Sequence, residues 1–161
     1  MEVGVARIGP ISIEIEAPAP LVYQLICAMG QGPQRPGEGA RVIERDGNDF
    51  TCEFSTPISL PVGGPRLVTT REAVRIVPPD TVLFRHLDGP LRGLSETITV
   101  LPLTERRTRV SYLGAYPMTG LRAWLRVVIA RPIIRRVVRD HFVDIKGQAE
   151  ARAARSRVYA A

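Results

Sequence analysis

The amino-acid sequence predicts an α+β fold in which antiparallel strands occupy the middle of the chain and one long helix ends it. Near the start, Ile11, Ile13 and Ile15 alternate with polar residues, as in a half-buried strand. Between residues 40 and 116, strand-like segments are joined by short turn sequences, which favours antiparallel neighbours. From Gly120 onward, apolar residues recur every three or four positions, as in an amphipathic helix.

The N-terminal part of the chain predicts one strand and one short helix. The strand covers Ile11 to Glu16, and Ala17-Pro18-Ala19-Pro20 then leads into a helix over Pro20 to Met29. Proline is tolerated in a first helical turn, because the N–H that it lacks would have no partner there. Residues 30–37 are rich in glycine and proline, which predicts a loop.

The middle of the chain predicts six further strands. Asp46-Gly47-Asn48-Asp49 is a strong turn sequence, so the strands on either side should form a hairpin. The segment from Pro57 to Pro65 contains three prolines, and we expect a loop or an irregular strand end there. The six expected strands are Arg41–Arg45, Phe50–Thr56, Arg66–Val77, Thr81–Leu87, Leu94–Leu101 and Thr108–Tyr116.

The C-terminal helix should begin at Gly120 and continue for about 30 residues, a length of about 45 Å. Pro132 lies inside this segment, and because proline removes one helical hydrogen bond we expect a kink or a break near Arg131. The expected apolar stripe comprises Leu121, Trp124, Leu125, Val128, Ile134, Val137, Val138, His141, Phe142 and Ile145.

Length and composition indicate a single domain over residues 1–161, ending in about eight residues that we expect to be disordered. Hydrophobic residues make up 45% and charged residues 24%, which are ordinary values for a globular protein. The two cysteines form no Cys-x-x-Cys motif, and neither a signal peptide nor an apolar run of about 18 residues is evident. We therefore expect a cytoplasmic protein. No phosphate-binding, dinucleotide-binding or zinc motif occurs, so no cofactor or metal is expected from motifs.

The net charge of +6 is the unusual feature of the composition, and Lys146 is the only cationic residue that is not arginine. The segment from Arg122 to Arg157 holds nine arginines and Lys146 against three acidic residues, so the charge is concentrated in the C-terminal helix. A basic helix favours contact with an anionic membrane or an acidic partner. Nucleic acid is not expected, because aromatic and basic residues do not alternate as they do in a stacking surface.

The order of elements and four short segments resemble the START/SRPBCC superfamily over nearly the whole chain. The segments are Ile13 to Leu25, Glu72 to Asp80, Thr108-Arg109-Val110 with Tyr112, and Ile145 to Glu150. This resemblance implies the helix-grip fold, a curved antiparallel sheet of about six to seven strands wrapped around the C-terminal helix with an apolar cavity between them. The superfamily includes lipid-transfer proteins, polyketide aromatase/cyclases and hormone receptors, so the fold does not name the activity. Residues 30–39 lack the aromatic side chains usual there, which implies a cavity mouth that is either more open or more mobile.

Strand register then brings three titratable residues together. If Val77 opposes Thr81, then Glu72 lies opposite His86 on a face whose other members are apolar. If the apolar faces are also matched across the next hairpin, around Gly89-Pro90, then His86 lies opposite Glu96. With this face turned inward, the three side chains are neighbours on the cavity wall, because opposed side chains lie about 5 Å apart.

A carboxylate–imidazole–carboxylate cluster allows three interpretations. It could act in acid/base catalysis, because a carboxylate raises the pKa of histidine and holds its tautomer. It could supply three metal ligands, or it could merely orient a ligand. As catalytic candidates we take Glu72, His86, Glu96 and Tyr112, with Tyr116 as an alternative to Tyr112. As cavity-lining candidates we take Phe54, Val74, Phe84, Ile98, Tyr116 and Trp124.

Three functions remain open from the sequence. The first is a protein that binds a hydrophobic or aromatic small molecule, with polyketide cyclase or dehydratase chemistry as implied by the resemblance. The second is a non-catalytic lipid or isoprenoid carrier whose arginine-rich helix contacts anionic membranes. The third is an interaction module whose basic helix binds protein or RNA.

Overall fold

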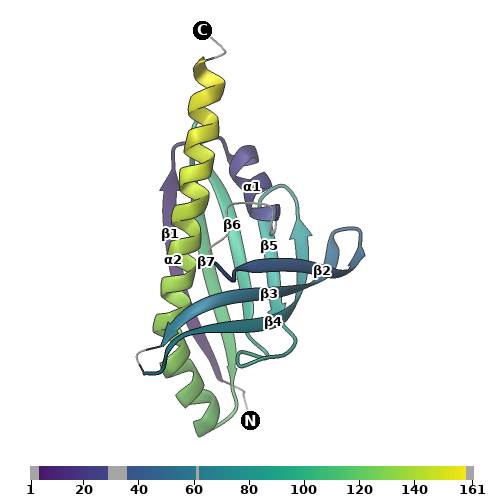
Figure 1. Cartoon of the computed structure of the whole chain (residues 1–161). Coiled ribbons are helices and arrows are strands. Elements are labelled where there is room, and N and C mark those ends of the chain that lie inside the picture. Colours follow the sequence, from purple (N-terminus) through teal and green to yellow (C-terminus); the bar gives the residue numbers. More distant parts are fainter. Residues whose placement is uncertain (1–3, 29–35, 61, 159–161) are drawn as a thin grey trace.

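The sheet curves around the long C-terminal helix, as the sequence predicts (Figure 1). The computed structural model describes residues 4–28, 36–60 and 62–158. Seven strands form one sheet in the order β1-β7-β6-β5-β4-β3-β2, and every neighbouring pair is antiparallel. The elements are β1 (Gly4–Ile15), α1 (Ala19–Cys27), β2 (Gly39–Asp46), β3 (Asp49–Leu60), β4 (Gly64–Val77), β5 (Thr81–His86), β6 (Ser95–Thr104), β7 (Arg107–Met118) and α2 (Leu121–Val158).

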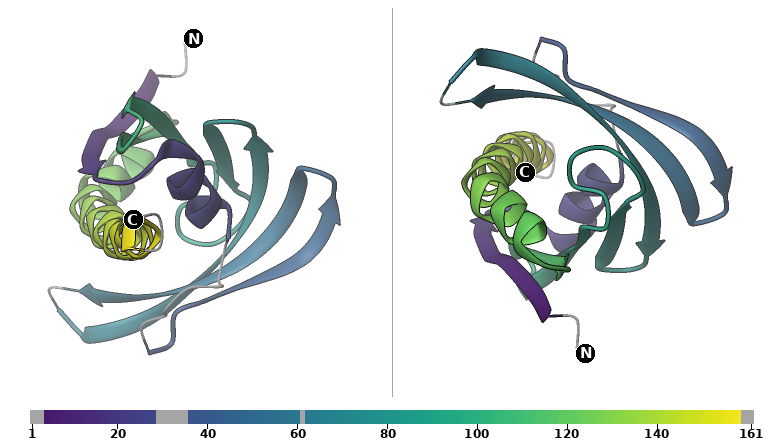
Figure 2. Two further views of the ribbon diagram at one scale, coloured as in Figure 1. Left: turned by 90° about the horizontal axis from the view of Figure 1, so that it is seen from above. Right: turned by 90° about the horizontal axis from the view of Figure 1, so that it is seen from below.

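Both helices lie on the concave side of the sheet (Figure 2). α2 packs mainly against β1 and also contacts β7 and α1. The core between these layers contains Ile8, Ile11 and Ile15 of β1 and Val22 and Ile26 of α1, all of them buried. The alternating pattern of the first strand is therefore confirmed for Ile11 and Ile15. Within the described residues, no helix combines the length and the apolar character needed to cross a bilayer.

The hairpin of β3 and β4 is longer than the sequence predicts. Instead of a loop between Pro57 and Pro65, the two strands pair as far as Leu60 and Gly64. Pro57 is tolerated because β2 pairs with β3 only as far as Ser55, so the far end of β3 lies at the edge of the sheet. The predicted turn after Asp46 is confirmed, with Gly47 at a φ of 59°.

α2 has 38 residues and continues through Pro132 without a break. Because Pro132 is exposed, the carbonyl that loses its helical partner faces the solvent side and can be hydrated. The helix also extends to Val158, into the terminal residues that were expected to be disordered. The predicted end of α1 at Met29 lies outside the described residues.

The face that α2 presents to the sheet differs from the expected stripe. In its first turns the buried residues are Ala123 and Val127, followed by Ile134. Leu121, Trp124, Leu125 and Val128, which were expected to pack, are exposed instead. The first turns carry two apolar stripes, and small side chains such as Ala123 allow the closer approach to the sheet. Periodicity alone cannot decide between two such stripes.

Candidate functional site

A cavity of about 380 Å³ lies between the concave face of the sheet and the two helices. Its lining is mostly apolar on the sheet side, with Phe54, Phe84 and Ile98, and α2 adds Val138, Phe142 and Ile145. The rings of Phe54 and Phe84 lie 6.3 Å apart between centroids and are tilted by 60°. Polar side chains on the sheet wall of this cavity are Ser55, Thr56, Glu72, Glu96 and Tyr112, and α2 adds His141, Asp144, Gln148 and Arg152.

The register of β4 and β5 is the predicted one, and Glu72 lies opposite His86. The register of β5 and β6 differs from the prediction by two residues, so that Glu96 lies opposite Phe84 instead of His86. The cause is the connection between the strands, where His86 N donates to Leu94 O and Gly93 N donates to His86 O. A shift of two residues keeps every side chain on its face. Glu96 therefore still points to the concave side, one diagonal step from His86.

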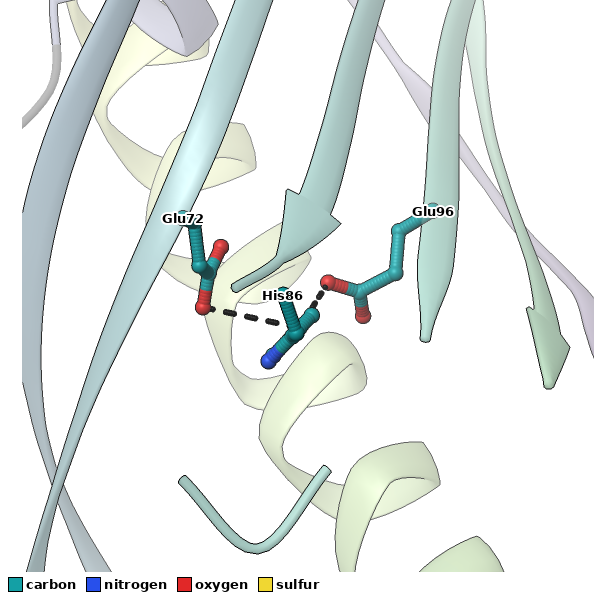
Figure 3. Close-up of side chains that lie close together, drawn as sticks. All are labelled: Glu72, His86 and Glu96. Atoms are coloured by element: carbon teal, nitrogen blue, oxygen red, sulfur yellow. Dashed lines mark hydrogen bonds and ion pairs between the residues drawn. The ribbon is translucent and has the colours of Figure 1, made fainter. Parts of the chain in front are cut away.

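The three side chains meet around one nitrogen atom of the imidazole (Figure 3). His86 Nε2 lies 2.7 Å from Glu96 Oε2 and 3.5 Å from Glu72 Oε1. Two hydroxyl groups complete the set: Tyr112 donates to Glu96 Oε1 at 2.5 Å, and Thr70 donates to Glu72 Oε1 at 2.7 Å. The four strands β4 to β7 thus contribute to one network, in which hydrogen bonds join Thr70 to Glu72 and Tyr112 to His86 through Glu96, and the 3.5 Å contact between Glu72 and His86 links the two parts.

The network is largely shielded from water, which changes how its members ionise. Glu72 is 7% exposed and His86 is 6% exposed. Burial raises the pKa of Glu72, and the charge of Glu96 adds to this effect, although His86 and Thr70 oppose it. Burial opposes protonation of His86, but its hydrogen bond to Glu96 and the two carboxylates outweigh this and raise its pKa. Burial and Glu96 also raise the pKa of Tyr112, which therefore stays a hydroxyl donor.

The second nitrogen of His86 indicates the tautomer. Nδ1 is buried and has no hydrogen-bond partner within the described residues. In the neutral ring one nitrogen carries the proton and the other is an acceptor. A proton on Nε2 is shared with Glu96, whereas a proton on Nδ1 would be buried without an acceptor. The neutral imidazole is therefore the Nε2–H tautomer.

The same three residues offer ligand atoms within 4.8 Å of one another, which is close enough for one metal ion. A metal on Nε2 would place the imidazole proton on Nδ1, and metal-bound histidines usually donate that proton to an acceptor. No described residue supplies this acceptor. The arrangement therefore fits a shared proton better than a metal ion.

The other predicted site residues divide into two groups. Phe54, Phe84 and Ile98 line the cavity together with Glu72, Glu96 and Tyr112. Val74 and Tyr116 are buried in the core but do not line it, and Trp124 is 50% exposed on the far side of α2. Tyr116 and Trp124 lie near the first turns of α2, whereas the α2 residues that line the cavity begin only at Val137.

Sequence reasoning missed two contributions to the site. Thr70 lies two residues before Glu72 on the same strand, so its side chain shares the inward face, and the parity argument could have found it. His141 lines the cavity from α2, with Nδ1 at 3.7 Å from Glu38 Oε1, and its side chain is 59% exposed. No sequence signal brings Glu38 to His141, because the two belong to elements far apart in the chain.

The chain is similar to solved structures at low sequence identity. The Zhui aromatase/cyclase from Streptomyces sp. R1128 matches with a TM-score of 0.77 and 14% identity, over 92% of this chain and 96% of that chain. A point mutant of norcoclaurine synthase from Thalictrum flavum matches with a TM-score of 0.69 and 15% identity, over 92% and 96%. A START superfamily protein from Mycobacterium smegmatis matches with a TM-score of 0.59 and 13% identity, over 94% and 97%.

Comparison by sequence gives no relative: no protein-family model and no curated protein matches the chain. The likeness to solved structures shows that the fold is the helix-grip fold. At these identities it shows the fold alone, so the chemistry must be argued from the residues of the site.

Proposed function

We propose that the protein binds an aromatic or polyketide-like molecule in the cavity and catalyses an aldol-type cyclisation or dehydration. The observation that carries this proposal is the pair of carboxyl groups, Glu72 and Glu96, joined by His86 at the wall of a mostly apolar cavity. Apolar walls suit a ligand with little charge, and a few convergent polar groups suit chemistry at one point of it.

The two carboxyl groups have environments suited to different roles. Glu72 is more deeply buried than Glu96, and burial raises its pKa, so it can hold a proton to donate. Glu96 lines the cavity and accepts hydrogen bonds from His86 and Tyr112, which fix the direction of its oxygens. We assign Glu72 as general acid and Glu96 as general base.

In the dehydration of a β-hydroxy ketone, Glu96 takes a proton from the carbon between the carbonyl and the hydroxyl-bearing carbon. Glu72 gives its proton to the departing hydroxyl group, a carbon–carbon double bond forms, and water leaves. In cyclisation, the same base creates the carbon nucleophile, and Glu72 protonates the oxygen of the carbonyl that is attacked. Each step leaves Glu96 protonated and Glu72 ionised.

His86 would restore the starting state. Its Nε2 carries one proton at a time: the protonated ring first gives this proton to Glu72 at 3.5 Å, and the freed nitrogen then takes one from Glu96 at 2.7 Å. His86 does not itself line the cavity, so it is a positioning and relay residue and not a group that touches the substrate. Tyr112 lines the cavity and holds the other oxygen of Glu96 in place.

Two of the structural neighbours are consistent with this proposal. Their names describe an aromatase/cyclase and norcoclaurine synthase, which are enzymes of this fold. The residues of the present chain carry the argument, because the identities are 14% and 15%.

The proposal is tested with the β-hydroxy ketone formed from benzaldehyde and acetone, whose dehydration product absorbs in the near ultraviolet. We expect the protein to accelerate dehydration and Glu72→Gln to reduce the rate by about a hundredfold or more. Glu44→Gln is the matched control, because Glu44 is exposed and lies on β2 outside the cavity. Binding of the ketone is followed separately by NMR line broadening.

Two results would overturn the proposal. The first is dehydration by Glu72→Gln at the rate of the Glu44→Gln control. The second is a ketone that binds without turnover in the unaltered protein, which would instead support the carrier function.

A further inference from the structure

The solvent-facing side of α2 carries an apolar ridge that takes no part in the cavity. The exposed fractions are 72% for Leu121, 50% for Trp124, 45% for Leu125, 50% for Val128 and 64% for Ile129. We call these five residues the α2 ridge. Single exposed apolar side chains are ordinary, but five of them within nine residues form a contiguous patch that indicates a binding surface.

The ridge lies on the side of α2 opposite the core. Ala123 and Val127 turn toward the sheet in these turns and are buried. At 3.6 residues per turn, Leu121, Leu125 and Val128 fall roughly half a turn away from them. The ridge is also separate from the cavity, because the residues of α2 that line the cavity begin only at Val137.

The charges on this part of the helix are all positive. No acidic residue occurs between Leu121 and Arg139, and the first turn of α2 contains none. Arg135, Arg136 and Arg139 are exposed and continue the outward face beyond Pro132, and Arg122 lies beside the ridge. The N-terminal end of a helix adds a partial positive charge of its own.

We propose that the α2 ridge docks on an anionic lipid bilayer. The ridge would enter the boundary between headgroups and acyl chains, and the three arginines would contact the headgroups, as in an interfacial amphipathic helix. A second copy of the chain is a poorer occupant, because a twofold interface on this helix would bring like-charged arginine groups together. This proposal does not depend on catalysis in the cavity.

Trp124 allows a direct test, because it is the only tryptophan of the chain and belongs to the ridge. The full-length protein is mixed at low salt with vesicles of phosphatidylcholine, with or without phosphatidylserine. We expect flotation and a blue shift of the Trp124 emission only with phosphatidylserine, and weakening by added salt.

Two variants separate the apolar and the charged contributions. Leu125→Ser with Ile129→Ser should abolish the blue shift, and Arg135→Ala with Arg136→Ala should weaken binding roughly tenfold or more. Val143→Ser is the matched control, because Val143 is 57% exposed on the same helix but outside the ridge. Circular dichroism and thermal unfolding show that each variant is folded.

Absence of flotation and of a blue shift at low salt would overturn the proposal. So would equal binding by the ridge variant and the Val143→Ser control. A concentration-dependent dimer that the ridge variant loses, without any binding to vesicles, would assign the ridge to a second copy instead.

Discussion

His86 and Glu96 share a 2.7 Å hydrogen bond although the strand register sets them one diagonal step apart. Glu96 lies directly opposite Phe84, and its long side chain crosses to reach His86. By contrast, Glu72 lies directly opposite His86, but its oxygen is more distant, at 3.5 Å. The shortest contact of His86 in the network is therefore made by a long side chain that extends along the sheet face, and not by the residue directly opposite His86.

The hydrogen bond from Tyr112 to Glu96 should be measurable as stability. Tyr112→Phe removes one hydroxyl group that is buried and donates to a carboxyl group. We expect a loss of about 1.5–3 kcal/mol in the free energy of unfolding, the usual range for hydrogen bonds to charged groups. Urea unfolding measures it, and a loss near zero would mean that water replaces Tyr112.

Gly114→Ala should break the hydrogen bond from Tyr112 to Glu96 by crowding the tyrosine hydroxyl. A Cβ on Gly114 would lie 2.8 Å from Tyr112 Oη and 3.2 Å from Ile8 Cβ, so the tyrosine must move away. Crowding of this kind costs about 1–3 kcal/mol. Gly4→Ala on β1 is the control, because its Cβ would meet only Met118 Cβ at 3.8 Å.

The double variant sharpens this prediction. Gly114→Ala and Tyr112→Phe both remove the hydrogen bond to Glu96. The sum of their separate losses in the free energy of unfolding should therefore exceed the loss measured for the double variant. Simple additivity, measured by the same unfolding experiment, would show that Gly114→Ala leaves the Tyr112 hydroxyl in place.

Stability should depend on pH through His86. Its pKa is raised above 6.5 in the folded protein, so its contribution is fully present below 6.5 and is lost as the pH rises through the folded pKa. The free energy of unfolding of the unaltered protein, relative to His86→Gln, should therefore fall as the pH rises above 6.5. Urea unfolding over a pH series measures this difference, and an increase with pH would contradict the raised pKa.

Metal removal distinguishes the two chemistries that the cluster allows. With a shared proton on His86 Nε2, a chelator should leave ketone dehydration unchanged. Zinc added in excess should slow it, because the ion would compete with the proton for Nε2. Loss of activity on chelation, restored by zinc, would assign Glu72, His86 and Glu96 as metal ligands.

Much of the fold could be predicted because the strands alternate cleanly and their turns are short. The hairpin around Pro78-Pro79-Asp80 determines its own register, so Glu72 opposite His86 followed from the sequence. The register of β5 and β6 did not follow from the sequence. The connection from Leu87 to Leu94 is longer and forms its own hydrogen bonds, and these shift the register by two residues. Because a shift of two residues leaves each side chain on its predicted face, the cluster of Glu72, His86 and Glu96 still forms.

The orientation of α2 was beyond sequence reasoning for a different reason. Its first turns offer the sheet either large side chains such as Leu121 and Trp124 or small ones such as Ala123. The space left by the curved sheet decides between them, and that space is a property of the whole fold. This is why Trp124 was expected in the cavity and lies instead on the α2 ridge.

The central claim is that burial at the cavity wall raises the pKa of Glu72 beside His86 and Glu96. Its most direct test is an NMR titration of the Glu72 carboxyl in protein with isotope-labelled glutamate side chains, assigned with Glu72→Gln. We predict a pKa above the ordinary value of 4.5, with a second inflection as His86 titrates. A Glu72 carboxyl that titrates at or below 4.5, with no response to His86, would contradict the claim.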